Sequence, residues 1–541
     1  MEILNLKDVT FWYGDSKKSA LKDINLTVNE GEFVLIVGPS GCGKSTLLRM
    51  INRIIPDYYG GTIKGNIYLK GNDIKKLKRE DIVKSVGMVY QHPEKQIVLQ
   101  DVEREIAFGL ENFNTEINKM KRNVCEVMSL LNINNIRHKI TTEISGGEKQ
   151  KVAIASVVSM DPDIILFDEP VSQLDPIAAE EVLNCIKKLN RDIGKTVILV
   201  EQRIDKCFDM ADKVVFMENG TIVGEGTPHN IPENIDKKYF IPSLAYVYKK
   251  AGRTNIPINV KEGRKFIENV NIEYNVPKHK DKDNKSLAFE VRRLNFEYKK
   301  NNKVLDNINL KVYKGEVISV MGENGAGKST LFKIVCGLIK KFKGSVTIDN
   351  VNIKKLNYKD KIKKIGYLSQ NPNDYFGRDT VLQEVAYTLK NIDEYDENRV
   401  KKIMEDLDIY NLKDRNPRDL SGGEKQRVGI AATIVTNPDI LILDEPTRGM
   451  DSSSKEKLGT IIRNLSKEGK SIVIITHDSD FTADYTDKLF LMFNGEIVAS
   501  GNTEDIIYDS IYYSSQVAKV FKNKCKIVKT QDAINLLKVI K

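Results

Sequence analysis

Two nine-residue segments, GPSGCGKST (38–46) and GENGAGKST (322–330), decide the fold of this chain of 541 residues. Each follows a short apolar run, FVLIV (33–37) and VISVM (317–321), and each leads into a stretch with helical apolar spacing. A buried strand, a glycine-rich loop and a helix form the context in which backbone N–H groups turn towards the phosphates of a nucleotide. The pattern therefore predicts a phosphate-binding loop, and it does so twice.

Different residues of the two loops are expected to bind the phosphates and the Mg²⁺ ion of a nucleotide. The expected phosphate ligands are Gly38, Pro39, Ser40, Gly41, Cys42, Gly43, Lys44, Ser45 and Thr46 in the first loop, and Gly322, Glu323, Asn324, Gly325, Ala326, Gly327, Lys328, Ser329 and Thr330 in the second. Lys44 and Lys328 can neutralise the β- and γ-phosphates, and the N-terminus of the following helix adds a favourable dipole. The hydroxyls of Ser45 and Ser329 can bind Mg²⁺.

Further motifs recur in the same order in both halves. These are ISGGEKQKVAIA (144–155) with LSGGEKQRVGIA (420–431), and DIILFDEP (163–170) with DILILDEP (439–446). Ser145 precedes Glu169 by 24 residues, and Ser421 precedes Glu445 by the same distance. Ordered motifs at matched spacing indicate that the chain is an internal duplication.

Each half also has an apolar run that ends in two carboxylates, Asp168–Glu169 and Asp444–Glu445. The first acid of each pair is expected to bind the magnesium shell, and the second to orient and polarise the attacking water. An isolated Asp-Glu pair is often only the start of a solvated loop, but its place after a phosphate loop favours catalysis. The SGGE segments lead into helices and predict a second anion site in each half, which makes sense if it serves a partner's nucleotide.

Composition excludes several other classes of protein. The formal charge of +9 comes from 84 Lys and Arg against 75 Asp and Glu, and the two signs are interleaved, so we expect no nucleic-acid partner. No apolar run approaches the ~18 residues that a membrane span needs, and MEILNLKDV at the N-terminus has no signal-peptide core. The six cysteines show no paired spacing, which favours a reducing compartment.

The order of phosphate loop, glutamine loop, SGGE signature, DEP motif and switch position resembles the ATP-binding cassette (ABC) ATPases over nearly the whole chain. The resemblance implies ATP and Mg²⁺ as ligands and an α/β fold with two tandem P-loop NTPase domains. Each domain would be a RecA-like lobe with a helical lobe and a small antiparallel β region. It also implies that the cassettes close head to tail, so that one half's phosphate loop meets the other half's signature.

The same resemblance assigns roles to single residues. Tyr13 and Tyr298 would stack on adenine, Gln91 and Gln370 would be the glutamine-loop residues, and Asp175 and Asp451 would cross the interface. The signature residues would be Ser145, Gly146, Gly147 and Glu148 in the first half, and Ser421, Gly422, Gly423 and Glu424 in the second. The metal ligands would be Ser45, Gln91, Asp168, Ser329, Gln370 and Asp444.

The halves differ at the switch position. His477 in IVIITHD (472–478) matches the histidine that contacts the γ-phosphate, whereas Gln202 stands at that place in TVILVEQRID (196–205). Glutamine cannot become cationic, although its amide can donate a hydrogen bond. Since both catalytic glutamates are present, Gln202 alone predicts unequal hydrolysis at the two sites.

One stretch of sequence resembles a particular class of ABC ATPase. YQHPEKQIVLQDVEREIAFGLEN (90–112) resembles the pattern of energy-coupling factor (ECF) transporter ATPases, and SQNPNDYFGRDTVLQEVAYTLKN (369–391) is a looser version. The resemblance implies a peripheral subunit on the cytoplasmic face of the cell membrane. Its partners would be a transmembrane scaffold subunit and a substrate-binding membrane subunit, and its cargo a vitamin, a vitamin precursor or a metal ion.

Two alternatives remain, a soluble tandem-cassette ATPase that acts on ribosomes and a tandem sugar-import ATPase. The continuations VSQLD (171–175) and TRGMD (447–451) and the short linker disfavour the first, and the intact second phosphate loop disfavours the other. The expected domains are 1–235 and 287–505 for the two cassettes, 236–286 for a helical appendage of the first half and a linker, and 506–541 for a helical tail. The charged segment KHKDKDNK (278–285) is the expected linker, and the loop IIPDYYGGTIKG (54–65) is longer than its counterpart.

Overall fold

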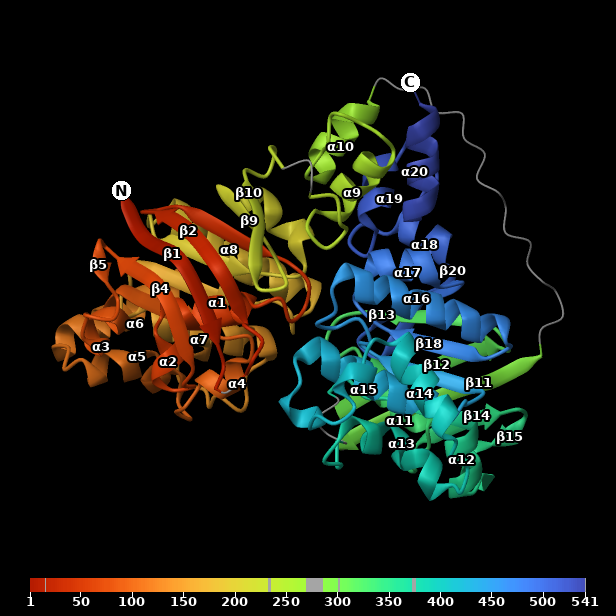
Figure 1. Ribbon diagram of the computed structural model, residues 1–541. Coiled ribbons are helices and arrows are strands. Elements are labelled where there is room, and N and C mark those ends of the chain that lie inside the picture. Colours follow the sequence, from red (N-terminus) through yellow and green to blue (C-terminus); the bar gives the residue numbers. More distant parts are fainter. Residues whose placement is uncertain (15, 232–234, 269–285, 300–301, 372–375, 541) are drawn as a thin grey trace. The chain divides into compact units, whose positions relative to one another are not determined.

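The computed structural model describes residues 1–540 except 15, 232–234, 269–285, 300–301 and 372–375 (Figure 1). The chain divides into two compact units, the first made of Met1–Tyr246 and Ile256–Asn259, and the second of Val247–Asn255 and Val260–Lys541. Each unit holds one six-stranded and one four-stranded sheet, which confirms the predicted α/β fold with two P-loop domains. The expected linker, 278–285, lies outside the described residues.

The six-stranded sheet of the first unit has the order β10-β9-β3-β8-β7-β6. Its strands are β3 (Phe33–Val37), β6 (Val86–Val89), β7 (Ile164–Asp168), β8 (Thr196–Val200), β9 (Lys213–Glu218) and β10 (Thr221–Gly226). The strands are parallel except for β10, which pairs antiparallel with β9. Every residue of β3, β7 and β8 is buried, because parallel sheets are covered on both faces and their strands are apolar throughout. The carboxyl ends of β3, β7 and β8 therefore meet at one edge, where the phosphate loop and the DEP motif begin.

The smaller sheet of the first unit is antiparallel, with the order β2-β1-β4-β5. Its strands are β1 (Glu2–Trp12), β2 (Leu21–Asn29), β4 (Thr62–Leu69) and β5 (Asn72–Asp73). The residues of β2 alternate between buried and exposed, as expected for strands with only one face on the core. This sheet is the small antiparallel β region that the family resemblance implies.

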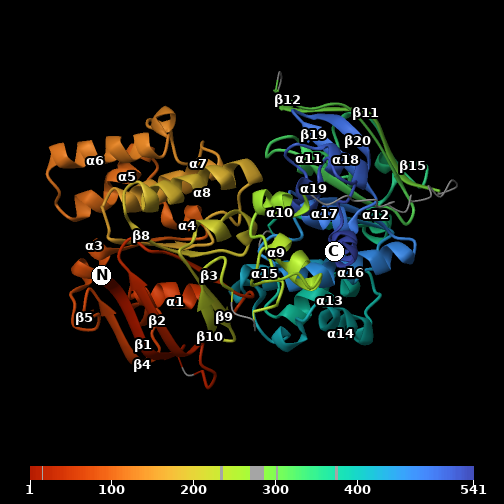
Figure 2. The ribbon, with the colours of Figure 1, turned by 90° about the horizontal axis from the view of Figure 1, so that it is seen from above.

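The helices of the first unit fall into two groups. The helices outside the helical lobe are α1 (Lys44–Ile51), α2 (Ile54–Asp57), α3 (Arg79–Ser85), α4 (Pro93–Gln96) and α8 (Pro176–Arg191). The others are α5 (Val102–Asn112), α6 (Ile117–Leu130) and α7 (Gly146–Val158), which pack on one another and form the helical lobe. In Figure 2 this lobe lies on the opposite side of the unit from β1, β2 and β4. Val102, Ile106 and Leu110 are buried on one face of α5, which is the spacing that fixes an amphipathic helix on a core.

The second unit repeats this plan. Its large sheet has the order β16-β17-β18-β13-β19-β20 and its small sheet the order β12-β11-β14-β15. The strands are β11 (Leu287–Lys299), β12 (Asn302–Tyr313), β13 (Val317–Met321), β14 (Lys343–Ile348), β15 (Val351–Asn352), β16 (Ile365–Leu368), β17 (Ile440–Asp444), β18 (Ser471–Ile475), β19 (Lys488–Phe493) and β20 (Glu496–Asn502). The cassette helices are α11 (Lys328–Val335), α12 (Tyr358–Lys364), α13 (Val381–Asn391), α14 (Glu397–Asp406), α15 (Gly422–Ile434), α16 (Ser452–Lys467) and α17 (Ser479–Tyr485).

The last part of the second unit is a group of short helices, α18 (Thr503–Asp509), α19 (Gln516–Phe521) and α20 (Thr530–Val539). Helices α9 (Ser243–Lys250) and α10 (Val260–Ile267) come much earlier in the chain, yet α10 lies beside α19 (Figure 1). The guanidinium of Arg264 donates a hydrogen bond to the carbonyl oxygen of Lys519, with 2.9 Å between the two atoms. The expected appendage therefore does not belong to the first half alone, because its residues Val247–Asn255 and Val260–Ile267 pack in the second unit.

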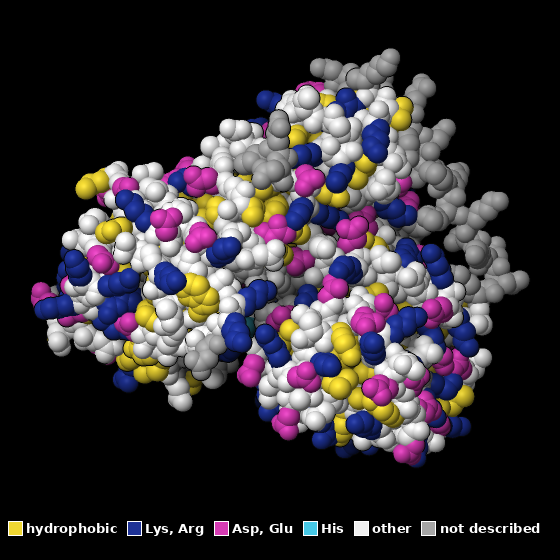
Figure 3. Space-filling view, viewed as in Figure 1, with side chains coloured by type: hydrophobic (Ala, Val, Ile, Leu, Met, Phe, Trp, Pro, Cys, Tyr) yellow, Lys and Arg dark blue, Asp and Glu magenta, His cyan; other side chains and the backbone are white. Residues whose placement is uncertain are grey.

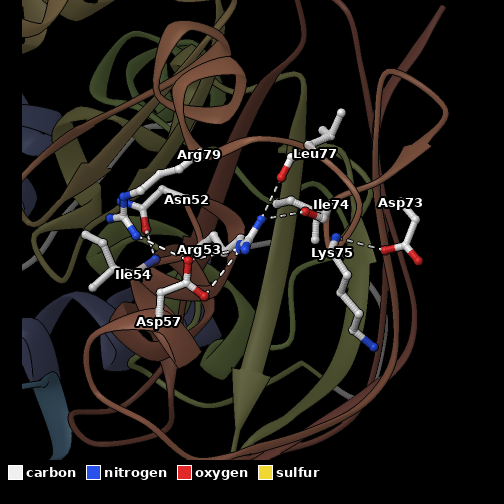
Figure 4. Close-up of polar contacts among 9 residues, drawn as sticks. All are labelled: Asn52, Arg53, Ile54, Asp57, Asp73, Ile74, Lys75, Leu77 and Arg79. Atoms are coloured by element: carbon white, nitrogen blue, oxygen red, sulfur yellow. Dashed lines mark hydrogen bonds and ion pairs between the residues drawn. The ribbon is translucent and has the colours of Figure 1, made fainter.

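Polar contacts anchor the long loop that follows α1 in the first unit (Figure 4). The guanidinium of Arg53 donates to the carbonyl oxygens of Ile74 and Leu77, at 3.2 and 2.8 Å, and lies 3.0 Å from the carboxylate of Asp57. Arg79 contacts the same carboxylate at 3.2 Å. The loop is therefore a fixed part of the cassette rather than a loose insertion.

The surface carries both signs of charge. On the face shown in Figure 3, Lys and Arg side chains are interspersed with Asp and Glu side chains, as the interleaved sequence predicts. Among the described residues, no helix combines the length and the apolar character needed to cross a membrane.

Candidate active site

The first phosphate loop has the geometry that an anion requires. Gly41 and Gly43 have φ angles of 76° and 103°, in the left-handed region that favours glycine. The ammonium group of Lys44, the first residue of α1, is buried and donates to the carbonyl oxygens of Gly38 and Pro39 at 2.8 and 2.9 Å. Among the described residues, no carboxylate lies within ion-pair distance of Lys44. A buried cation whose contacts are two carbonyl oxygens and, at 3.9 Å, the sulfur of Cys42 suits a phosphate.

The second loop repeats this arrangement. Gly325 and Gly327 have φ angles of 85° and 91°. Lys328 is buried at the start of α11, and its ammonium group donates to the carbonyl oxygens of Gly322 and Glu323 at 2.6 and 2.8 Å. The two loops are therefore equivalent at these glycines and in the placement of the lysine.

The predicted magnesium ligands meet in both units. The hydroxyl of Ser45 donates to Asp168 Oδ1 at 2.8 Å, and Ser329 likewise hydrogen-bonds Asp444. Burial raises the pKa of Asp168 and of Asp444, because a buried carboxylate lacks the stabilisation that water provides. A hydroxyl beside a buried carboxylate is a donor set that fits Mg²⁺, and a bound Mg²⁺ would neutralise phosphate charge there.

Both predicted catalytic glutamates have an unusual backbone. Glu169 and Glu445 have φ angles of 47° and 52°, in the left-handed region that residues with a side chain seldom adopt. Their amide groups donate to the last residues of the neighbouring strands, Glu169 to Val200 at 2.9 Å and Glu445 to Ile475 at 2.8 Å. Such strain persists only where the surroundings hold it, and it is common in active sites.

Two side-chain amides hold the carboxylate of Glu169. Gln91 Nε2 donates to Oε2 at 3.0 Å, and Gln202 Nε2 donates to Oε1 at 2.6 Å. Burial raises the pKa of Glu169, while the charge of Lys44 and the hydrogen bond from Gln202 act in the opposite direction. The structure thus brings the predicted glutamine-loop and switch residues together on one carboxylate.

The second unit surrounds its glutamate differently. His477 Nε2 lies 3.5 Å from Glu445 Oε1, and both side chains are buried. Gln370 is exposed, whereas Gln91 is half-buried on Glu169. The two candidate sites therefore share their phosphate loops but not the groups around the glutamate.

The two tyrosines predicted to face adenine lie at the start of the phosphate-loop helices. The hydroxyl of Tyr13 is 3.0 Å from that of Thr46, and the hydroxyl of Tyr298 is 3.4 Å from that of Thr330. Tyr298 is 61% exposed, so its ring is accessible to a ligand. The contact with the threonine was not anticipated from the sequence.

The signature residues cap helices. Ser145 and Glu148 form a reciprocal capping box at the start of α7, and Ser421 and Glu424 form one at the start of α15. Within each unit, no hydrogen bond among the described residues joins the signature to the phosphate loop. Asp175 and Asp451 cap α8 and α16 by accepting hydrogen bonds from backbone amides, those of Ile177 and Ala178 and that of Ser454, respectively.

Sequence reasoning missed Glu201, the residue that follows β8. Its side chain is only 1% exposed and accepts hydrogen bonds from two backbone amides, those of Val171 and Gln202. An acidic residue after an apolar run predicts the start of a solvated loop, so no local signal indicates that this carboxylate turns inward.

Comparison with known proteins identifies the family. The family profile described as "ABC transporter" matches residues 21–172 and 305–448, which together make up more than half of the chain. The chain belongs to this family. It is therefore an ABC ATPase with two cassettes, as the repeated motifs predict.

Several known proteins align with most of this ABC ATPase. A protein of Clostridium tetani, provisionally named an ABC transporter ATP-binding protein, is 65% identical over 439 residues, which cover 81% of this chain and 100% of that protein. A Bacillus anthracis protein with the same kind of name is 34% identical over 531 residues, 96% of this chain and 95% of that protein. The archaeal ribosome recycling factor aABCE1, solved with the stalk protein aP1, aligns with a TM-score of 0.60 and 23% identity over 93% of this chain and 91% of that chain. At that identity the likeness shows the fold alone.

Proposed function

We propose that this ABC ATPase binds ATP with Mg²⁺ at both phosphate loops and uses its hydrolysis to drive an ECF-type membrane transporter. In the reaction, Lys44 and Lys328 hold the phosphates, and Glu169 and Glu445 orient the attacking water. Gln202 and His477 complete the two sites from the neighbouring strand. Ser145 and Ser421 serve the nucleotide of the opposite cassette.

The coupling to a partner rests on one observation, a matched pair of exposed aromatic side chains. Phe108 on α5 and Tyr387 on α13 stand at the same register of AFGLEN (107–112) and AYTLKN (386–391), and they are 36% and 40% exposed. Aromatic side chains are enriched in the centres of protein interfaces. Their equivalent positions in the two cassettes favour docking of two segments of one partner.

A buried glutamate makes the stretch between the glutamine loop and each docking helix rigid. Glu105 on α5 accepts hydrogen bonds from the amides of Val98 and Leu99, at 3.0 and 2.7 Å. In the second unit Glu384 accepts from the amides of Gly377 and Arg378, both at 2.9 Å. A displacement of the docking helix would therefore be transmitted along the loop towards Gln91, which contacts Glu169.

The partner would be a transmembrane scaffold subunit, together with a separate substrate-binding membrane subunit. The cargo would be a vitamin, a vitamin precursor or a metal ion, and the chain would be peripheral on the cytoplasmic face of the membrane. These assignments follow the resemblance of residues 90–112 to ECF ATPases. The names of the relatives, as ABC transporter ATP-binding proteins, support a transport role.

The experiment that tests this proposal separates membranes from ribosomes in lysates of cells that express the tagged full chain. We expect the wild-type chain in the membrane fraction. The double variant Phe108→Asp/Tyr387→Asp should be in the supernatant and keep its ATPase activity. Ile193→Asp, at an exposed apolar position outside this stretch, is the matched control and should stay with the membranes. Co-sedimentation of wild type with ribosomes would favour the alternative function, and equal release of all variants would contradict docking at Phe108 and Tyr387.

A further inference from the structure

The carboxylate of Glu201 joins the ends of two neighbouring strands in the first unit. Its Oε1 accepts a hydrogen bond from the amide of Val171 at 3.0 Å, and its Oε2 accepts one from the amide of Gln202 at 3.1 Å. Val171 belongs to the loop after β7, and Gln202 follows β8. One buried side chain therefore fixes both loops that bear on the candidate site.

These two loops carry the two partners of the closest contact in that site. Glu169 lies two residues before Val171, and the side chain of Gln202 donates to Glu169 at 2.6 Å. The amide of Glu169 also donates to Val200, directly before Glu201. Because Glu201 binds the backbone on either side of the contact, it determines how the amide of Gln202 meets the carboxylate.

The second unit has no glutamate at the equivalent position. Thr476 stands where Glu201 stands in the first unit, and its hydroxyl accepts a hydrogen bond from the amide of Asp478, two residues further along the same loop, at 3.1 Å. A threonine side chain is too short to bridge two loops as the glutamate does. The glutamate bridge is therefore present in the unit with glutamine at the switch position, and the unit with histidine there has a threonine instead.

Burying a carboxyl group costs folding free energy unless hydrogen bonds compensate, so a glutamate at this buried position needs its two amide donors. An apolar residue would pack there without that cost but would leave the Val171 and Gln202 amides without their acceptor. We propose that Glu201 is a positioning residue of the first site, which aligns Gln202 on Glu169 for ATP hydrolysis. This role rests on the proposed ATPase function of the site.

The test uses the full chain in a Glu445→Gln background, in which turnover comes from the first site. Glu201→Gln keeps one acceptor oxygen but replaces the other, which accepts a hydrogen bond from a backbone amide, with an NH₂ group that can only donate, so it should lower kcat about tenfold. The KM for ATP should stay within about twofold, because the phosphate loop is untouched. Gln202→Ala should lower kcat similarly, and the double variant should be little worse than either single one, since the two residues act as a unit.

Asp205→Asn is the matched control. Asp205 follows Glu201 by four residues and also accepts a backbone hydrogen bond, at 2.7 Å from the amide of Ser243. Ser243 begins α9, which is not part of the candidate site. This variant should leave kcat unchanged. A loss confined to thermal stability in Glu201→Gln, or additive losses in the double variant, would overturn the proposal.

The outcome also separates this inference from the proposed function. If wild type hydrolyses ATP but Glu445→Gln shows no turnover at all, the first site has no reaction for Glu201 to serve, and this inference fails alone. If wild type itself does not hydrolyse ATP, the proposed function fails as well.

Discussion

The side-chain amide of Gln202 donates a hydrogen bond to the carboxylate of Glu169, with 2.6 Å between Nε2 and Oε1. In the second unit the equivalent pair is His477 and Glu445, at 3.5 Å. An imidazole can take up a proton near neutral pH, and an amide cannot. The two cassettes therefore place chemically different groups on the residue that is to activate water.

Exchanging the switch residues should exchange the behaviour of the two sites. His477→Gln should lower the ATPase activity of the full chain about tenfold, because it removes the group that can become cationic. Gln202→His, measured in the Glu445→Gln background, should raise turnover at the first site. Steady-state phosphate release checks both variants, with thermal midpoints as the control for folding. Unchanged rates in both would show that the switch residue does not limit hydrolysis.

The stability of the first unit should depend on pH through Glu201. Burial, followed by the charge of Glu169, raises the pKa of Glu201 from its ordinary value of 4.5 to about 8. Between these values the native state holds a proton that the unfolded chain has released, so the free energy of unfolding falls as the pH rises through this window. The midpoint of Glu201→Gln should therefore fall less than that of wild type between about pH 5 and pH 8.

The control for this pH dependence is Glu218→Gln. Hydrogen bonds from Lys237 and Tyr239 lower the pKa of Glu218, so its titration lies below the same window. Its profile from about pH 5 to pH 8 should run parallel to that of wild type. A parallel profile for Glu201→Gln as well would contradict the assignment.

The Ser45 hydroxyl should matter for the metal rather than for the fold. Ser45→Ala and Ser329→Ala each remove a predicted Mg²⁺ ligand that now contacts Asp168 or Asp444. The Mg²⁺ concentration for half-maximal hydrolysis should rise about tenfold, with a smaller change in the affinity for free ATP. Ser156→Ala removes a hydroxyl that bonds only its own helix, to Ala153, and should leave the Mg²⁺ dependence unchanged. Equal Mg²⁺ curves for all variants would argue against this metal site.

Arg53→Ala should destabilise the first unit without affecting its chemistry. The variant leaves the carbonyl groups of Ile74 and Leu77 without their donor and breaks the ion pair with Asp57. The expected cost is about 1–3 kcal/mol in the free energy of unfolding, measured with denaturant. Lys84→Ala breaks the exposed ion pair with Glu80 and the contact of the ammonium group with the ring of Phe113, and should cost less than ~1 kcal/mol. Equal effects would mean that the loop contacts contribute little.

Much of the fold follows from local signals in the chain. Strands β3, β7 and β8 are continuous apolar runs, and glycines that need a left-handed backbone mark the loop after β3. The assignment of Ser45 and Asp168 to one Mg²⁺ site implies that they lie together, and the carboxyl ends of β3 and β7, on either side of β8, share an edge of the sheet. The structure has this contact at 2.8 Å.

The missed features depend on contacts between distant segments. Glu105, Glu201 and Glu384 follow no pattern that distinguishes them from exposed acids, and each is buried because backbone amides elsewhere need an acceptor. The anchoring of the loop after α1 by Arg53 is equally non-local. The sequence identified that loop as long but offered no account of what holds it.

Because Gln202 and His477 differ, the two sites should hydrolyse ATP unequally. The most direct measurement compares the ATPase activity of Glu169→Gln and Glu445→Gln on the full chain assembled with its partners. We expect Glu445→Gln to lose most of the activity and Glu169→Gln to retain a substantial part of it. Equal losses in the two variants would contradict the claim.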